Sequence, residues 1–137
     1  MNNIEVGTEL PGFTLPPLKQ SMLNDYAQAS GDHNPIHLDP EAAKKAGLPG
    51  VIAPGMFVMG NAGRVVIDWL PQTQLRKFNA RFKRVTQLGD VISFAGKVVE
   101  LIDEGNEVLA RCEIQASRED GEKKLVAEAL VVIKSNS

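Results

Sequence analysis

The chain has 137 residues, of which 43% are hydrophobic and 23% are charged, a composition typical of a globular protein that buries its own core. Its formal net charge of −2 gives no electrostatic basis for binding nucleic acid or an anionic membrane surface. The sequence has no bilayer-length hydrophobic run, no signal-peptide pattern and one cysteine, Cys112, which excludes an internal disulfide. We therefore expect a single domain over residues 1–137 that works in the cytoplasm.

The first third of the chain predicts one strand and two helices. Residues 7–15 could form a short strand that ends at Pro16-Pro17, because proline cannot donate to a ladder. Residues 19–30 place hydrophobic side chains at helical spacing. A second, short helix is expected from Pro40 to Gly47, with the preceding aspartate as its N-cap.

The longest predicted helix covers residues 55–70 and is hydrophobic on nearly every side. A helix of this kind is usually buried on most sides. Gly60 and Gly63 lie inside it, and each glycine costs about 1 kcal/mol relative to alanine in a helix. We therefore expect neighbouring backbone to approach these two positions closely.

Four strands are predicted in the second half of the chain, over residues 78–83, 91–101, 108–117 and 125–133. Short polar segments that contain glycine separate the last three strands and predict hairpin turns. Consecutive antiparallel strands together with one hydrophobic helix predict an α+β domain, in which an antiparallel sheet wraps around a long central helix.

A carboxylate and an imidazole lie in the loop after the first predicted helix. Asp32 and His37 are five residues apart, so a regular helix or strand would turn their side chains away from each other. Gly31 can end the helix in a left-handed conformation, and Pro35 pushes Asn34 out of the helical region. These three residues are expected to support a rigid loop in which the acid and the base converge.

The same loop resembles a known family. Gly31-Asp32-His33-Asn34-Pro35-Ile36-His37 is similar to the hydratase signature of the MaoC-like dehydratases, the (R)-specific enoyl-thioester hydratases. The resemblance continues into Ile52-Ala53-Pro54-Gly55-Met56, then into Ala80-Arg81-Phe82-Lys83 and Leu88-Gly89-Asp90, and so covers nearly the whole chain. The single-domain bacterial dehydratases are the most similar members. The resemblance implies the hot-dog fold, with the acid/base loop overhanging the sheet.

The resemblance also implies an activity, the reversible hydration of an enoyl thioester. The reverse reaction is dehydration of an (R)-3-hydroxyacyl-CoA or acyl-carrier-protein thioester in fatty acid metabolism. Asp32 and His37 would hold one water molecule and serve the two proton transfers of the reaction. The main-chain N–H of Gly55, at a helix start, would stabilise negative charge on the thioester oxygen. Because only protons move, we expect no metal and no redox cofactor.

The family resemblance also suggests how the chain assembles, and two alternative functions remain open. The family resemblance implies a side-by-side dimer that extends the sheet, most simply a homodimer. The same fold supports acyl-thioesterases, in which a carboxylate directs water at the carbonyl carbon, and the chain could also be a subunit of a heterodimeric dehydratase. A metal site built from His33, His37 and Asp39 is not expected, because Pro35 breaks the helix that would align the two histidines.

Overall fold

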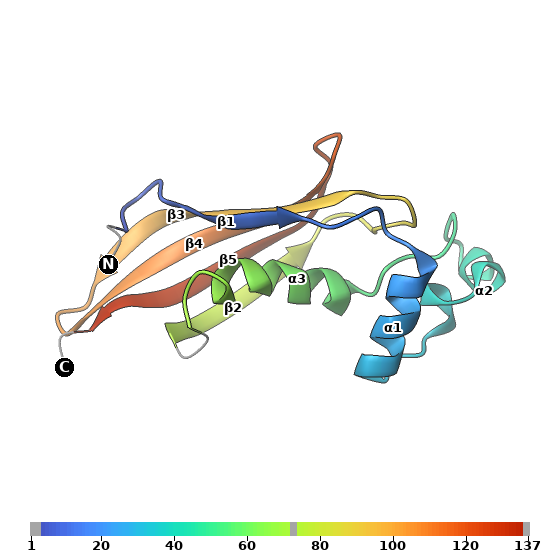
Figure 1. The fold of residues 1–137 in the computed structure, drawn as a ribbon, viewed down its shortest axis with the longest axis horizontal. Helices are drawn as coiled ribbons and strands as arrows, with labels where there is room; N and C mark the ends of the chain where they lie inside the picture. Colours follow the sequence, from blue (N-terminus) through green and yellow to red (C-terminus); the bar gives the residue numbers. More distant parts are fainter. Residues whose placement is uncertain (1–3, 72–73, 136–137) are drawn as a thin grey trace.

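The computed structural model describes residues 4–71 and 74–135, which form five strands, three α-helices and one 3₁₀ turn (Figure 1). Along the chain these are β1 Glu9–Thr14, α1 Gln20–Ser30, η1 Pro35–His37, α2 Pro40–Lys45, α3 Gly55–Ile67, β2 Leu75–Phe82, β3 Ile92–Asp103, β4 Glu107–Arg118 and β5 Lys123–Ser135. Each strand and helix expected from the sequence is present, with boundaries that differ by no more than three residues.

The strands form one antiparallel sheet in the order β1-β3-β4-β5-β2. Two hairpins connect β3 to β4 and β4 to β5, so these three long strands make the centre of the sheet (Figure 1). Strand β2 follows α3 in the chain and pairs with β5, which makes β2 one edge of the sheet, while β1 makes the other edge. The α+β class and the antiparallel sheet expected from the sequence are confirmed.

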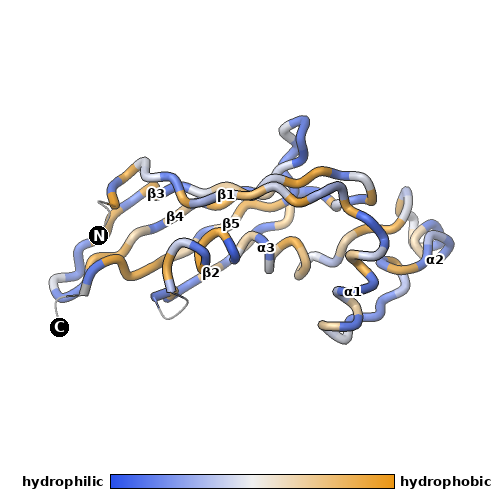
Figure 2. The backbone as a smooth tube through the Cα atoms, viewed as in Figure 1, coloured by the Kyte–Doolittle hydropathy of each residue, from blue (hydrophilic) through white to orange (hydrophobic). Residues whose placement is uncertain are grey.

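Helix α3 lies across one face of this sheet, as Figure 1 shows. Its buried side chains join the strands in one hydrophobic cluster, and they are Val58, Ala62, Val65 and Val66. Burying a valine fully is worth about 1.5–3 kcal/mol, so this face is enough to hold the helix on the sheet. Figure 2 shows hydrophobic stretches along α3 and the central strands, whereas the turn between β4 and β5 is hydrophilic.

The opposite side of α3 is open, and here the sequence-based expectation is wrong. The side chains of Met56 and Ile67 are 62% and 42% exposed. Among the described residues, a Cβ atom placed on Gly60 or Gly63 would meet no atom of another element within 4 Å, so none of the described backbone approaches these glycines closely. The reason is that, within the described residues, the sheet covers α3 from one side only (Figure 1).

The helices α1 and α2 and the turn η1 gather beyond one end of the sheet (Figure 1). Helix α1 buries Leu23 and Ala27, and the ring of Tyr26 meets the ring of Phe57 on α3 edge-on, with 5.5 Å between ring centroids. Helix α2 begins as expected, because the Asp39 carboxylate accepts a hydrogen bond of 3.0 Å from the Glu41 main-chain N–H. This end of the molecule therefore places the loop 31–37 near the start of α3.

Candidate active site

The loop 31–37 is held by short hydrogen bonds between side chains and backbone. Gly31 ends α1 in the left-handed conformation at φ +79°, and its N–H donates to the Ala27 carbonyl at 2.9 Å. The Asp32 carboxylate accepts from the Asn34 N–H at 3.2 Å, and the Asn34 side chain accepts from the Ile36 N–H at 3.2 Å. These bonds turn the chain directly into the η1 turn, which starts at Pro35.

His37 is the last residue of η1 and is buried, with 8% of its surface exposed. Its Nδ1 lies 2.7 Å from the main-chain carbonyl oxygen of Ile52. A carbonyl oxygen can only accept a hydrogen bond, so Nδ1 must carry the proton, and Nε2 of the neutral imidazole is left with a free lone pair. A second bond ties the same segments together, because the Ile52 N–H donates to the Ile36 carbonyl at 3.3 Å. In its neutral form, His37 can therefore accept a hydrogen bond only at Nε2.

Gly55 is the first residue of α3 and follows Pro54 as the N-cap. The first N–H groups of a helix have no partner inside the helix, and the main-chain N–H of Gly55 donates to no acceptor among the described residues. This N–H also lies at the positive end of the helix dipole. The start of α3 can therefore receive an oxygen atom that carries negative charge.

His37 and Gly55 line the same cavity, which has a volume of about 270 Å³. Its wall is formed by residues from η1, from the loop before α3 and the start of α3, from the end of β2 and the segment after it, and from β5. They are His37, Ile52, Ala53, Gly55, Val58, Phe82, Lys83, Arg84, Val85, Thr86 and Lys124. The ring of Phe82 lies closest to the glycine, since a Cβ atom on Gly55 would be 3.2 Å from two ring carbons. The cavity thus combines a base, an unpaired amide and a partly apolar wall.

Asp32 is exposed and does not line this cavity. The structure therefore brings together two of the three residues for which the sequence suggested a role in the chemistry, the imidazole and the amide. The Asp32 carboxylate lies on the solvent side of the loop that carries His37. It accepts a hydrogen bond from the main-chain N–H of Asn34, two residues later.

A match to a known family decides what kind of protein this is. Residues 6–119 match the sequence model described as the MaoC like domain. The chain belongs to the MaoC-like domain family. Its neighbours among solved structures include the unliganded R-hydratase PhaJ1 from Pseudomonas aeruginosa, with a TM-score of 0.79, 25% identity, and coverage of 98% of this chain and 84% of that one. The hot-dog architecture expected from the sequence is confirmed by this similarity.

Two curated relatives of this MaoC-like chain show how far the similarity extends. The alpha subunit of 3-oxo-4,17-pregnadiene-20-carboxyl-CoA hydratase from Mycobacterium tuberculosis is 44% identical over 52 residues, which are 38% of this chain and 17% of that subunit. A mitochondrial 3-hydroxyacyl-acyl-carrier-protein dehydratase from Solanum lycopersicum is 27% identical over 110 residues, 80% of this chain and 67% of that protein. The chain thus spans only a small part of the first relative and about two thirds of the second.

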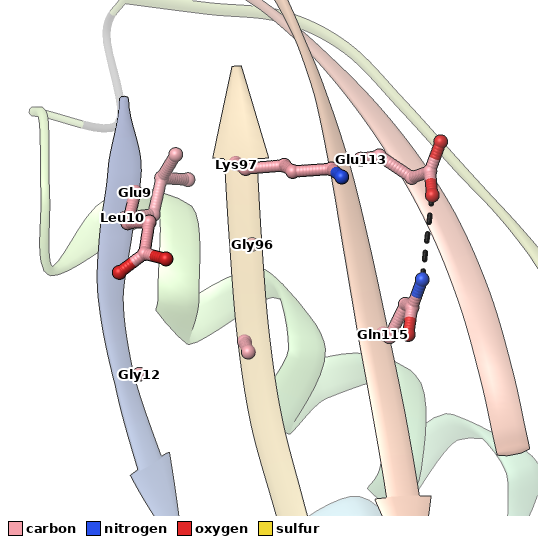
Figure 3. A pocket seen from close by; sticks show the side chains of 8 residues that line it. Glu9, Leu10, Gly12, Gly96, Lys97, Glu113 and Gln115 are labelled. Carbon is pink, nitrogen blue, oxygen red and sulfur yellow. Dashed lines mark hydrogen bonds between the residues drawn. The ribbon is translucent and has the colours of Figure 1, made fainter. Parts of the chain in front are cut away.

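A second hollow in the MaoC-like domain lies on the face of the sheet that is turned away from α3 (Figure 3). Its volume is about 370 Å³, and its polar side chains include Glu9, Lys97, Glu113 and Gln115. It shares no residue with the cavity that contains His37. The described residues hold no group of three or more His, Cys, Asp or Glu side chains arranged to bind a metal ion, and none of their helices is long and hydrophobic enough to cross a membrane.

Several residues of the candidate site were not anticipated from the sequence. From the sequence, Phe82 belongs to a predicted strand and to the family-like segment Ala80-Arg81-Phe82-Lys83, without a role in the site, and neither Thr86 nor Lys124 belongs to any of the motifs. Thr86 and Lys124 are 3% and 2% exposed, although both are polar. A lysine that follows a predicted turn is usually solvated, so no local pattern distinguishes Lys124 from its neighbour Lys123.

Proposed function

We propose that the chain, as one domain over residues 1–137, is a hydro-lyase that adds water reversibly to an enoyl thioester and forms an (R)-3-hydroxyacyl thioester. Membership of the MaoC-like family supports this, as do relatives that are named hydratases and dehydratases. The observation that carries the proposal is the cavity that His37 and Gly55 share, with the imidazole fixed by Ile52 and the amide left unpaired.

His37 is the base in this proposal. The Nδ1–H group is hydrogen-bonded to the Ile52 carbonyl. Nε2 can therefore accept a proton from a water molecule as the water oxygen attacks C3 of the substrate. The π electrons of the double bond move towards C2 and the thioester oxygen. The proton can then be delivered to C2, so that the net change is the addition of H and OH across the double bond. No electrons are gained or lost, and the step needs no metal or redox cofactor.

Gly55 and Asp32 have the other two roles. The Gly55 N–H stabilises the negative charge that develops on the thioester oxygen, and it does so with the help of the α3 dipole. Asp32 orients the attacking water by accepting a hydrogen bond from its second O–H, which stays in the product as the 3-hydroxyl group. This role requires substrate or a second subunit to enclose the exposed side of the loop. Gly31, Asn34 and Pro35 support this loop without contacting substrate.

The substrate in this proposal is an acyl-CoA or acyl-carrier-protein thioester, and the working assembly is a homodimer in the cytoplasm. The dimer would extend the sheet through β2, because β2 is an edge strand and carries Phe82, 51% exposed, beside the cavity. A heterodimer in which this chain is the catalytic half is the alternative assembly. The single cysteine, Cys112, is free and buried, which suits a reducing compartment.

Hydration of crotonyl-CoA by the purified chain tests the proposal. Loss of absorbance at the enoyl band, with 3-hydroxybutyryl-CoA as the product, is the expected result. Product analysis separates the alternatives, because a thioesterase would release free CoA thiol instead. A chain that acts only as half of a heterodimer would be inactive alone, and an inactive homodimer would overturn the proposed homodimeric enzyme.

A further inference from the structure

A buried lysine lies behind the candidate site. Lys124, near the start of β5, is 2% exposed, and its Nζ donates hydrogen bonds to the Val85 carbonyl at 2.8 Å and to Glu122 at 2.6 Å. It also forms an ion pair with Asp90 at 3.3 Å. An ammonium group has three protons to donate. Two of these protons form hydrogen bonds, to the Val85 carbonyl and to Glu122, and the charge is also paired with Asp90. The ammonium group is therefore held by the protein itself even though Lys124 lines the cavity.

Asp90 binds the chain on the other side of Thr86 from the Val85 carbonyl. This carboxylate is 11% exposed and accepts a hydrogen bond of 2.9 Å from the Gln87 main-chain N–H through the oxygen that faces Lys124. The ion pair therefore grips the chain at the Val85 carbonyl and at the Gln87 amide, on either side of Thr86. The main-chain carbonyl of Lys124 also accepts from the Lys83 N–H at 3.0 Å.

The gripped segment in turn holds the residues before α3. The Thr86 carbonyl accepts a hydrogen bond of 2.8 Å from the Ala53 N–H, and Gln87 pairs with Ile52 in an isolated antiparallel bridge. Ile52 is the residue whose carbonyl orients His37, and Gly55 follows Ala53 by two residues. One short segment, 85–87, thus fixes the backbone that positions both the imidazole and the unpaired amide.

We propose that the Lys124–Asp90 ion pair is a clamp that sets His37 and Gly55 at their working positions, with Lys124 as a positioning residue. The inference rests on the proposed function, since it assigns the clamp to that site. A displacement of about 1 Å in reacting groups can cost on the order of 100-fold in rate. A loosened segment 85–87 therefore lowers turnover more than it lowers substrate binding.

Two substitutions test the clamp, with a neighbouring lysine as control. Lys124→Met removes the charge and all three donors, whereas Lys124→Gln keeps a donor for the Val85 carbonyl. Lys123→Met is the matched control, because Lys123 is exposed and makes no ion pair with the described residues. We expect Lys124→Met to lower kcat at least about tenfold and to change KM less than about threefold. Lys124→Gln should fall between Lys124→Met and wild type.

A second readout does not depend on activity. The chain has two histidines, so ¹⁵N-histidine labelling with His33→Gln for assignment isolates the imidazole signals of His37. We expect wild type and Lys123→Met to show the Nδ1–H tautomer, and Lys124→Met to show broadening or a mixture with the Nε2–H tautomer at temperatures well below unfolding. If Lys124→Met does not fold, Lys124→Gln and Asp90→Asn are compared in the same way.

The outcomes are separable. A folded Lys124→Met whose His37 spectrum and kcat equal those of Lys123→Met would overturn the clamp. Loss of thermal stability with an unchanged tautomer signal and unchanged turnover would show a purely structural ion pair and would also overturn it. If wild type turned over no enoyl thioester while the tautomer signal changed as expected, the proposed function would fail and the clamp on His37 would stand.

Discussion

Nδ1 of His37 donates a hydrogen bond of 2.7 Å to the main-chain carbonyl of Ile52, fifteen residues further along the chain. A main-chain acceptor cannot be removed by changing the Ile52 side chain, so the tautomer of His37 is built into the backbone path between η1 and α3. The Ile52 N–H returns a bond to the Ile36 carbonyl, which closes the two segments against each other. The orientation of the base therefore depends on main-chain geometry.

Replacing the proposed base tests its role directly. We expect His37→Ala and Asp32→Asn each to lower kcat/KM for crotonyl-CoA by about 10²–10⁴-fold, because the first change removes the base and the second removes the carboxylate that orients the attacking water. The measurement is the initial rate at the enoyl absorbance band. His33→Gln is the control, because His33 is exposed and lies in the same loop. Wild-type rates in both variants would remove these residues from the mechanism.

The substitution Gly55→Ala tests how much space the unpaired amide needs around it. The Cβ of Gly55→Ala would lie 3.2 Å from the Phe82 ring, which is 51% exposed and can move aside. The fold should therefore survive, because replacing glycine with alanine at an unstrained helical position stabilises the folded state by about 0.4–1 kcal/mol, which offsets the crowding against the ring. We expect kcat/KM to fall on the order of tenfold through misplacement of groups at the amide.

Phe82→Ala completes a double-mutant cycle with Gly55→Ala. If the crowding of the Phe82 ring causes the loss, adding Gly55→Ala to Phe82→Ala should cost less than adding it to wild type. The measurement is kcat/KM for the four proteins, together with thermal unfolding of each. Equal costs in both backgrounds would mean that the new methyl group acts on the cavity independently of the ring.

Cys112 offers a test of the core. The side chain is fully buried on β4, and burial raises the pKa of its thiol to about 11. The thiol is therefore protonated near neutral pH, and only the thiolate reacts rapidly with disulfide reagents. We expect no rapid reaction of the native chain with Ellman's reagent at pH 8 and one equivalent of reaction in concentrated guanidinium. Full reaction of the native protein within minutes would contradict the packing of β4.

The turn between β4 and β5 predicts a pH dependence. The Arg118 guanidinium donates two hydrogen bonds to Asp120, at 2.9 and 2.6 Å, and holds the pKa of that carboxyl well below its usual range. A lowered pKa in the folded state stabilises the fold above the unfolded pKa of about 3.9, and this contribution is lost as the pH falls through the folded pKa. The pair is exposed, so the effect is small.

Asp120→Asn isolates this contribution. Its unfolding temperature should lie slightly below that of wild type at pH 7, and the difference should shrink as the pH falls below about 4. Glu119→Gln is the matched control, because Glu119 is an exposed neighbour in the same turn and makes no ion pair with the described residues. A difference for Asp120→Asn that grew at low pH would have the wrong sign for a lowered pKa.

The state of assembly is measurable by light scattering. We expect a mass of at least twice the 14.9 kDa of one chain at micromolar concentration, because the outer edge of β2, beside the cavity, pairs with no other strand of the described part of the chain. A monomer across this range would contradict the proposed homodimer. Addition of a second, related subunit that restored activity would then favour the heterodimer.

Local sequence patterns predicted the elements, because each depends on spacing and turn chemistry within a few residues. The helix from Gly55 and the cap at Asp39 are examples. The same patterns failed where distant segments decide the outcome. The hydrophobicity of α3 predicted burial on most sides, yet the sheet covers one side, so Met56 is exposed.

Lys124 was missed for a related reason. Strand periodicity places successive side chains on opposite faces, but the pairing of β4 with β5 shifts register between Ala116 and Ser117. Lys124 and Leu125 are consequently both buried although they are adjacent. The contacts of Lys124 with Val85 and Asp90 are long-range, and no spacing in the sequence indicates them. The sequence therefore indicates the motif residues of loop 31–37, but it does not indicate that segment 85–87 fixes the backbone that positions them.

Phe82 is at once the last residue of an edge strand and the aromatic wall next to Gly55. Any chain that forms hydrogen bonds along the outer edge of β2 would also restrict the positions that the Phe82 ring can adopt. Association and turnover would then be linked through a single side chain, and the specific activity of wild type would rise with protein concentration until the edge is occupied.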